Sequence, residues 1–234
     1  MRTFAFGDIH GCHEPLLALL NAINPQPDDT LIFLGDMIDR GADSKGVIDT
    51  IRALEKRCHV ITIMGNHEEM MVASVKYRDE RRYWLKYGGV ETLQSFGGVG
   101  NDSDILFVPS DYISWLKGLK PYHETENFIF CHATPLPHIE MKSQPSDGLR
   151  WRFIPNDIEP RHCSGKTIIC GHSAQKNGKV LERDGIICID TYSYGEGNLT
   201  ALEVESMTAW QVPSPATASH NELTVTMFPL SLTH

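Results

Sequence analysis

The sequence predicts an α/β fold, in a single domain whose first half alternates strands and helices and whose second half is rich in β-strands. Three short apolar runs, at residues 3–6, 31–34 and 59–64, are separated by segments with helical periodicity. From residue 127 onward, short apolar runs dominate. The 234 residues are enough for one sizeable core, and the composition, 41% hydrophobic and 22% charged, is that of an ordinary globular protein.

The first half is typical of repeated βαβ units. The first run stops at Gly7, and a helical pattern over 14–22 follows it, with apolar residues at Leu16, Leu17, Leu19 and Leu20. The second run precedes a helix over 44–57, whose apolar stripe consists of Val47, Ile48, Ile51 and Leu54. The third run ends at Gly65, and a helix is expected to start near Glu68. Continuous apolar strands joined by helices indicate a sheet that is buried on both faces, with right-handed crossovers.

The second half reads as helices followed by strands. Residues 72–118 look mostly helical and carry several aromatic side chains. Further strands are expected at 128–131, 167–170, 180–183, 186–189, 199–204 and 209–212. Arg183-Asp184-Gly185 predicts a hairpin turn between two of them.

The domain is expected to cover residues 1–212, with a C-terminal tail at 213–234. The tail begins with a polar, proline-bearing stretch and then has an apolar segment at 223–232. A strand docked on the surface and a flexible tail both fit this pattern.

Composition also excludes several classes of protein. No run of about 18 apolar residues occurs, which argues against a membrane span. The N-terminus turns polar too early for a secretory signal, so a cytoplasmic protein is expected. The net charge of −9 argues against a nucleic-acid binder with a broad basic surface. The six cysteines include no C-x-x-C pair, so reduced, structural thiols are expected.

Polar side chains follow five of the expected strands, at or just past the point where each apolar run ends. The segments are Gly7-Asp8-Ile9-His10-Gly11, Gly35-Asp36, Gly65-Asn66-His67, Cys131-His132 and Cys170-Gly171-His172. The carboxyl ends of strands in an open α/β sheet are where ligands bind, so these loops are expected to converge on one rim.

The residue types suggest a centre with two metal ions. Carboxylates and imidazoles together suit Mn, Fe or Zn better than Ca or Mg. Asp8 and His10 lie two residues apart and would point the same way in an extended loop, as ligands of one ion, while Asp36 could bridge to a second. Two ions about 3.5–4 Å apart can clamp the attacking and leaving oxygens of a phosphoryl transfer.

Neighbouring residues supply the remaining chemistry. Arg40 can present a bidentate fork to phosphate oxygens. His67 follows Asn66 and is a sensible general acid for the leaving oxygen, and Asp39 could orient it and keep it protonated.

Together the motifs G-D-x-H-G, G-D-x-x-D-R-G and G-N-H-E, followed by lone histidines, resemble the phosphoprotein phosphatase branch of the metallophosphoesterases. The nearest likeness is to the short bacterial and phage serine/threonine phosphatases, and it extends from residue 3 to about residue 205. The resemblance implies a β-sandwich flanked by helices, in four layers (αββα), and it makes residues 1–212 a calcineurin-like catalytic domain.

The resemblance also implies a role for each site residue. Asp8, His10 and Asp36 would hold the first metal, and the second would be held by Asp36, Asn66, His132 and His172. His67 would be the acid, paired with Asp39, and Arg40 would bind phosphate. A second phosphate-binding arginine is expected at Arg152, with Arg150 as the other candidate, although the order of Trp and Arg in Leu149-Arg150-Trp151-Arg152 departs from the family pattern.

The implied function is hydrolysis of phosphomonoesters by in-line attack of a hydroxide that bridges the two ions. The first expectation is a serine/threonine protein phosphatase with two Mn²⁺ ions, with Fe or Zn as the other choices. The substrate would be a phosphorylated protein or a small phosphoester, with no nucleic acid or membrane partner, and the oligomeric state is open.

Two alternatives remain. The first is a symmetrical diadenosine-tetraphosphate hydrolase, which resembles this sequence over the same motifs and would be favoured by purine-stacking aromatic residues near the metals. The second belongs to another class, a metal-bound interaction module without catalysis.

Overall fold

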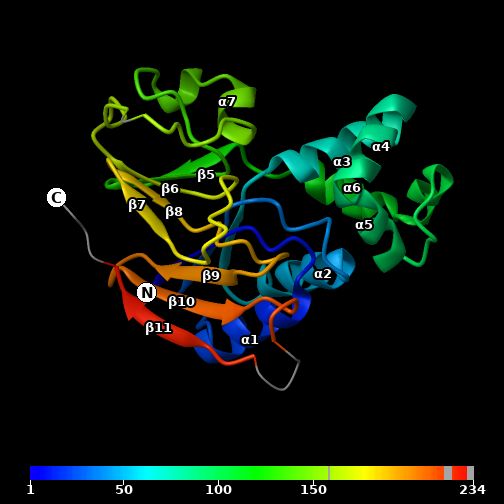
Figure 1. The fold of residues 1–234 in the computed structure, drawn as a ribbon, viewed down its shortest axis with the longest axis horizontal. Helices are drawn as coiled ribbons and strands as arrows, with labels where there is room; N and C mark the ends of the chain where they lie inside the picture. Colours follow the sequence, from blue (N-terminus) through cyan, green and yellow to red (C-terminus); the bar gives the residue numbers. More distant parts are fainter. Residues whose placement is uncertain (158, 219–222, 231–234) are drawn as a thin grey trace.

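The computed structural model describes residues 1–157, 159–218 and 223–230, and it contains two β-sheets with helices outside them (Figure 1). The strands are β1 (Thr3–Phe6), β2 (Thr30–Phe33), β3 (His59–Thr62), β4 (Tyr122–Glu124), β5 (Phe128–Cys131), β6 (Thr167–Cys170), β7 (Leu181–Arg183), β8 (Ile186–Cys188), β9 (Asn198–Glu203), β10 (Thr208–Pro213) and β11 (Thr226–Pro229). Within the described ranges, one sheet has the order β11-β10-β9-β1-β2-β3 and the other has the order β4-β5-β6-β8-β7.

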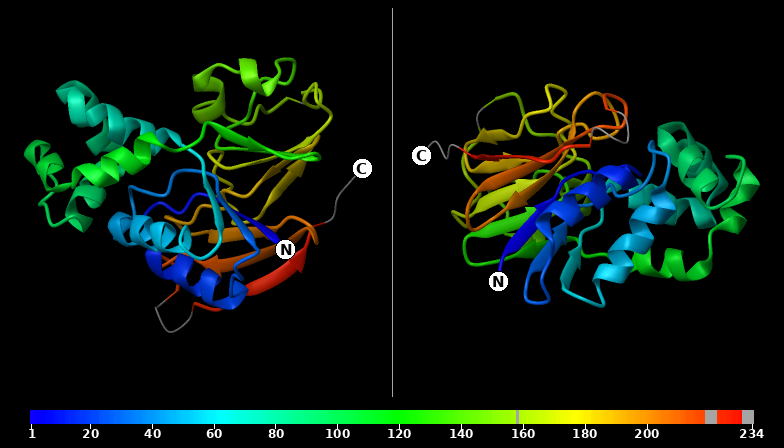
Figure 2. Two further views of the ribbon diagram at one scale, coloured as in Figure 1. Left: turned by 180° about the vertical axis from the view of Figure 1, so that it is seen from behind. Right: turned by 90° about the horizontal axis from the view of Figure 1, so that it is seen from below.

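The helices lie on the outer faces of these sheets and in one lateral group (Figure 2). They are α1 (His13–Ile23), α2 (Ser44–Leu54), α3 (Asn66–Lys76), α4 (Arg78–Trp84), α5 (Val90–Ser95), α6 (Ser110–Lys117) and α7 (Ser146–Arg150). Shorter turns are a π-helical segment η1 (Leu85–Gly89) and the 3₁₀ segments η2 (Asp102–Phe107) and η3 (Met141–Ser143). The predicted sandwich of two sheets flanked by helices is confirmed.

Alternation along the strands divides the apolar core into layers. Phe4 and Phe6 of β1 point to the layer under α1 and α2, while Ala5 between them belongs to the layer between the sheets. Phe130 of β5 closes the layer between the sheets from the other side. Leu149 of α7 belongs to a third layer, on the outer face of the second sheet.

The parallel strands β1, β2 and β3 place their carboxyl ends at one edge. Thr3 lies opposite Thr30, and Thr30 lies opposite His59, so the three strands end at matched positions. The strands β5, β6 and β8 are likewise parallel to one another. Loops that follow parallel strands leave a sheet on the same side, and this brings distant segments together.

Helix boundaries differ from the sequence expectations by a few residues. In α1, Leu17 is 45% exposed, although it was predicted as part of the apolar stripe. α2 buries its four predicted apolar residues but ends at Leu54, three residues before the predicted end. α3 begins at Asn66 rather than near Glu68, because the Glu68 side chain accepts a hydrogen bond from Gly65 N and caps the turn (2.9 Å).

The chain segment that joins β3 to β4 is mostly helical, as predicted, and its helices α3 to α6 form the lateral group in Figure 2. Trp84 anchors this group and is fully buried, whereas Tyr83 and Tyr87 are 44% and 45% exposed. Among the described residues, no helix combines the length and apolar character that a membrane crossing requires.

Two late features add to the β-rich half. The predicted hairpin joins β7 and β8 through Asp184 and Gly185, both with positive φ (51° and 82°). Beyond residue 213, β11 pairs antiparallel with β10, with Phe228 opposite Ala209. Residues 219–222, and the end of the predicted apolar segment at 231–232, lie outside the described residues.

Candidate active site

The loops after the parallel strands converge on one cavity of about 660 Å³. Seven of the residues predicted for the site line it: Asp8, His10, Asp36, Arg40, Asn66, His67 and His172. His132 is fully buried behind this wall. The structure therefore brings together the side chains that follow β1, β2, β3, β5 and β6.

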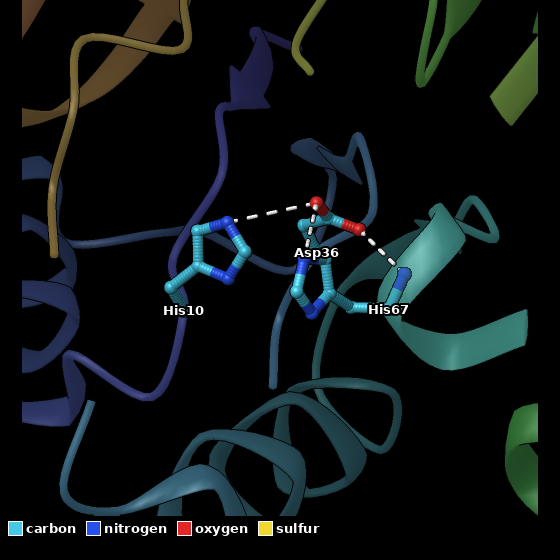
Figure 3. Close-up of side chains that lie close together, drawn as sticks. All are labelled: His10, Asp36 and His67. Carbon is cyan, nitrogen blue, oxygen red and sulfur yellow. Dashed lines mark hydrogen bonds and ion pairs between the residues drawn. The ribbon is translucent and has the colours of Figure 1, made fainter. Parts of the chain in front are cut away.

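Asp36 lies at the centre of a first cluster (Figure 3). Its Oδ2 atom is 3.5 Å from His10 Nε2 and 3.9 Å from His67 Nε2. Its position is fixed by the backbone, because Asp36 N donates to Glu68 and Asp36 Oδ1 accepts from His67 N (2.9 and 3.1 Å).

A second cluster lies on the other side of the Asp36 carboxylate. Asn66 Oδ1 is 2.9 Å from His132 Nε2 and 3.0 Å from His172 Nδ1. Asp36 Oδ1 is 3.3 Å from the same His132 nitrogen. The carboxylate of Asp36 thus faces both clusters, one with each oxygen.

Backbone carbonyls set the orientation of two imidazoles. His10 Nδ1 donates to Ile38 O and His132 Nδ1 donates to Leu34 O, each at 3.0 Å. In each ring the Nε2 atom then faces Asp36, and a ring fixed through its other nitrogen in this way is the arrangement that metal-ligating histidines use. In His172 the Nδ1 atom faces the cluster, 3.0 Å from Asn66 Oδ1, whereas Nε2 is buried and has no hydrogen-bond partner among the described residues.

Asp8 lies in the cavity wall, outside the two close clusters. Its carboxylate accepts from His172 N at 3.1–3.2 Å. A Cβ atom at Gly171 would lie 2.0 Å from Asp8 Oδ1, so only glycine permits this approach. The Gly-His step after β6 thus serves the position of Asp8 as well as that of His172.

The buried carboxylates of the site create a demand for positive charge. Burial raises the pKa of Asp8 well above its usual value, and burial with the nearby Asp36 raises the pKa of Asp190 to about 6. Burial also raises the pKa of Glu68 to about 7. At Asp36 burial acts in the same direction, but His132, His67 and His10 outweigh it and lower the pKa. Several acids around one set of aligned nitrogens fit divalent cations, which compensate for such charge.

Sequence reasoning missed Asp190, which lines the cavity and is 2% exposed. It follows the apolar run of β8 directly, after Ile189. The same signal that identified the other five strand ends, an acid or histidine after an apolar run, would have found it.

His67 and Asp39 form the predicted pair. His67 Nδ1 donates to Asp39 Oδ2 at 2.6 Å, and both side chains are almost fully buried. Trp84 Nε1 and Thr92 Oγ1 also donate to the Asp39 carboxylate, at 2.8 and 2.6 Å. Burial lowers the pKa of His67, but Asp36 and Asp39 outweigh it and raise the pKa above its usual value.

Arg40 reaches the first cluster and is held by two neighbours. Its Nη1 atom donates to His10 Nε2 at 2.8 Å, and its guanidinium lies 4.2 Å from the centre of the Tyr194 ring. Arg40 N donates to Gly88 O at 3.1 Å. Tyr194 also packs edge-on against the His10 ring, a contact that the sequence analysis did not anticipate.

Neither candidate for the second phosphate-binding arginine lines the cavity. Arg152 pairs with Glu159 (2.5 Å) and donates to the carbonyl of Pro135. Arg150 pairs with Glu69 at 2.6 Å. The assignment of Arg152 stays a prediction, and in this arrangement its guanidinium is engaged away from the two clusters around Asp36.

The fold and the paired clusters define a metallophosphoesterase. The chain belongs to the calcineurin-like phosphoesterase family, whose profile matches residues 1–176. The resemblance to its phosphoprotein phosphatase branch is confirmed.

Three similar proteins illustrate the range within this family. The symmetrical bis(5'-nucleosyl)-tetraphosphatase of Marinomonas sp. (strain MWYL1) is 24% identical over an alignment of 274 positions, gaps included. The alignment covers 91% of this chain and 97% of that protein. Serine/threonine-protein phosphatase 1 of Salmonella typhimurium is 30% identical over 132 residues, 56% of this chain and 58% of that protein. A crystal structure provisionally described as a diadenosine tetraphosphatase has a TM-score of 0.69 and 23% identity, and covers 91% of this chain and 93% of its own.

Proposed function

We propose that this chain hydrolyses dinucleoside tetraphosphates with the help of two divalent ions. The first ion would be held by Asp8, His10 and Asp36, and the second by Asp36, Asn66, His132 and His172. Mn²⁺ is the first choice, with Fe or Zn as the other choices, because such ligands do not select strongly among these metals. The bound ions would supply positive charge to the phosphoryl oxygens and lower the pKa of a water molecule.

The observation that carries the choice of substrate is the wall of the cavity. Beyond the two clusters around Asp36, the cavity wall includes the aromatic side chains of Tyr87, Trp151, Phe153 and Tyr194. Purine rings stack on such side chains, and about 660 Å³ lies within the range of pockets that enclose a small ligand. The relative from Marinomonas, which aligns over nearly the whole chain, is named for this activity.

The residues around the clusters would orient the substrate. Arg40 would bind the phosphoryl group with its planar fork, because a metal ion on His10 Nε2 would release the Nη1 atom that now donates to that nitrogen. His67 would give a proton from Nε2 to the departing oxygen, because its Nδ1 atom is committed to Asp39. Water is added across the central P–O–P bridge: one P–O bond forms, the bridging P–O bond breaks, and two nucleoside diphosphates leave with the protons of water.

The second candidate is the serine/threonine protein phosphatase predicted from the sequence. The pair of His67 and Asp39 favours it, because an alkoxide leaves poorly unless it receives a proton, whereas a nucleoside diphosphate leaves well without one. The phosphatase from Salmonella, similar over half of this chain, is named for this activity.

The test compares both substrates on one protein preparation. Protein loaded with Mn²⁺ is assayed for kcat/KM on diadenosine tetraphosphate and on a phosphothreonine peptide, with chromatography of the nucleotide products. We expect the dinucleotide to be preferred and ADP to be the nucleotide product. A preference for the peptide would move the chain to the second candidate, and no turnover of either substrate would support the silent interaction module.

A further inference from the structure

The cavity continues beyond the groups that act on the phosphoryl centre. One part of its wall comes from residues 153–156, another from residues 174–176, and a third from β7, through Leu181 and Arg183. We call this part of the cavity the outer lobe. Ile154 N donates to Ser173 Oγ at 2.9 Å, which ties the first segment to the residue just before the second.

The aromatic ring of Phe153 lies where the outer lobe meets the two clusters around Asp36. The Phe153 ring lies on the His172 ring, with 4.5 Å between centroids and 30° between planes. Phe153 is nevertheless 65% exposed, which is unusual for a large apolar side chain in a concave wall. An exposed ring that is held by stacking offers its free face to another flat ring.

Two cations, Lys176 and Arg183, line the outer lobe. Lys176 is exposed, and its ammonium has no partner among the described residues. Arg183 donates to the carbonyls of Pro155 and Asn156, and its Nε atom pairs with Asp184 Oδ2 at 3.8 Å. In a chain with a net charge of −9, a lysine without a partner among the described residues, beside an arginine in the same cavity, requires an explanation.

We infer that the outer lobe binds the nucleoside diphosphate that leaves, with its base on Phe153 and its phosphates between Lys176 and Arg183. The inference rests on the proposed function and deepens it, because it identifies which wall holds the leaving half of the substrate. A flat ring beside several negative charges is the ligand chemistry that matches an exposed ring beside two cations. Arg40 and the bound metal ions would hold the other half of the substrate, next to the P–O bond that breaks.

The test measures binding of ADP by calorimetry, with inorganic phosphate as the small reference ligand. Lys176→Ala removes an exposed charge without disturbing any contact, and we expect it to weaken ADP about 5-fold. Phe153→Ala should weaken ADP about 10-fold or more, because stacking on a base contributes about 1–3 kcal/mol. Phe153→Ala should bind phosphate as the unchanged protein does, because phosphate has no ring to stack.

Lys179→Ala is the matched control, because Lys179 is an exposed lysine of the same loop that does not line the cavity. It should change neither affinity. The inference is overturned if ADP does not bind, if Lys176→Ala leaves its affinity for ADP unchanged, or if Phe153→Ala weakens phosphate as much as it weakens ADP.

A separate readout distinguishes this inference from the proposed function. If diadenosine tetraphosphate is not hydrolysed but ADP binding still depends on Lys176 and Phe153, the outer lobe stands and the proposed substrate is wrong. If the dinucleotide is hydrolysed equally well by all the variants, the proposed function stands and the outer lobe is overturned. A phosphothreonine peptide whose binding depends on Lys176 while that of ADP does not would also overturn it.

Discussion

The Asp39→Asn substitution tests whether His67 acts as a proton donor. The Asp39 carboxylate accepts from His67, Trp84 and Thr92, and it is fully buried. Asparagine has nearly the same shape but no charge. A bound metal would engage Asp36, so Asp39 is the carboxylate that remains to keep His67 protonated.

The expected magnitude follows from this one interaction. A hydrogen bond to a charged group contributes about 1.5–3 kcal/mol, and each pKa unit corresponds to about 1.36 kcal/mol. The pKa of His67 should therefore fall by about 1–2 units in Asp39→Asn. In the unchanged protein the raised pKa keeps the imidazolium present to higher pH, and the acid is lost as pH rises through that value. The alkaline limb of the pH profile should move to lower pH by the same amount.

The assay compares leaving groups on protein loaded with Mn²⁺. With an alkyl phosphate ester, such as a phosphothreonine peptide, kcat of the variant should be about 10- to 100-fold below that of the unchanged protein at pH values above the shifted alkaline limb. The reason is that the departing alkoxide needs the proton of His67. With p-nitrophenyl phosphate, whose leaving group needs no proton, the loss should stay below about 3-fold. Equal losses on both substrates, or an alkaline limb that does not move, would refute the acid assignment, and thermal melting checks that the variant is folded.

Three further perturbations have expected outcomes. Arg40→Ala should lower kcat/KM by about 100-fold or more, since it removes a donor to the phosphoryl oxygens, whereas Arg152→Ala, whose guanidinium pairs with Glu159, should lower it less than about 3-fold; equal losses would restore Arg152 to the site. Chelation should lower the melting temperature by about 5–10 °C, because ligand at 100 times its Kd adds about 2.7 kcal/mol, and Mn²⁺ should restore it; an unchanged melting curve would contradict the metal ligands. Gly88→Ala should impair kcat/KM, because the φ of Gly88 is +110° and a Cβ atom there would lie 2.5 Å from Arg40 N. The control is Gly97→Ala, where φ is +91° but the space is open, and it should reduce stability only. Equal activities in the two variants would contradict this role of Gly88.

The strand ends were predictable because two simple rules act together there. Parallel strands end at one edge, and Asp, Asn and His are poor strand residues that become useful once the apolar run stops. Asp36 and His172 could therefore be expected near each other, although 136 positions separate them in the sequence. The limits of the strands predicted up to residue 212 agreed with the structure to within two residues, because apolar runs mark them directly, whereas β4 has no such run and was not predicted.

The contacts that depend on the direction of a side chain were not predictable. Arg152 fits the family spacing, yet its guanidinium turns to Glu159, and no pattern in the sequence indicates this. Tyr194 packs on Arg40 and His10 from a loop more than 150 residues away. Helix ends failed for a related reason: the start of α3 depends on a hydrogen bond from Gly65 to the Glu68 side chain, and not on periodicity.

Backbone conformation links the rim of the sheet to its chemistry. Among the described residues other than glycine, nine have positive φ, and five of them belong to the site: His10, Asp36, Asp39, Arg40 and His172. Such a conformation costs about 1–2 kcal/mol for an ordinary side chain and somewhat less for Asp. It also turns a side chain sharply away from the strand direction, so that residues leaving separate strands can face one point. The strain is offset by buried hydrogen bonds that fix the same loops, such as those that Asp36 N and Met37 N donate to the Glu68 carboxylate. The site is therefore built against local preference, and this explains why residue types and spacing predict its members while only the fold determines how they meet.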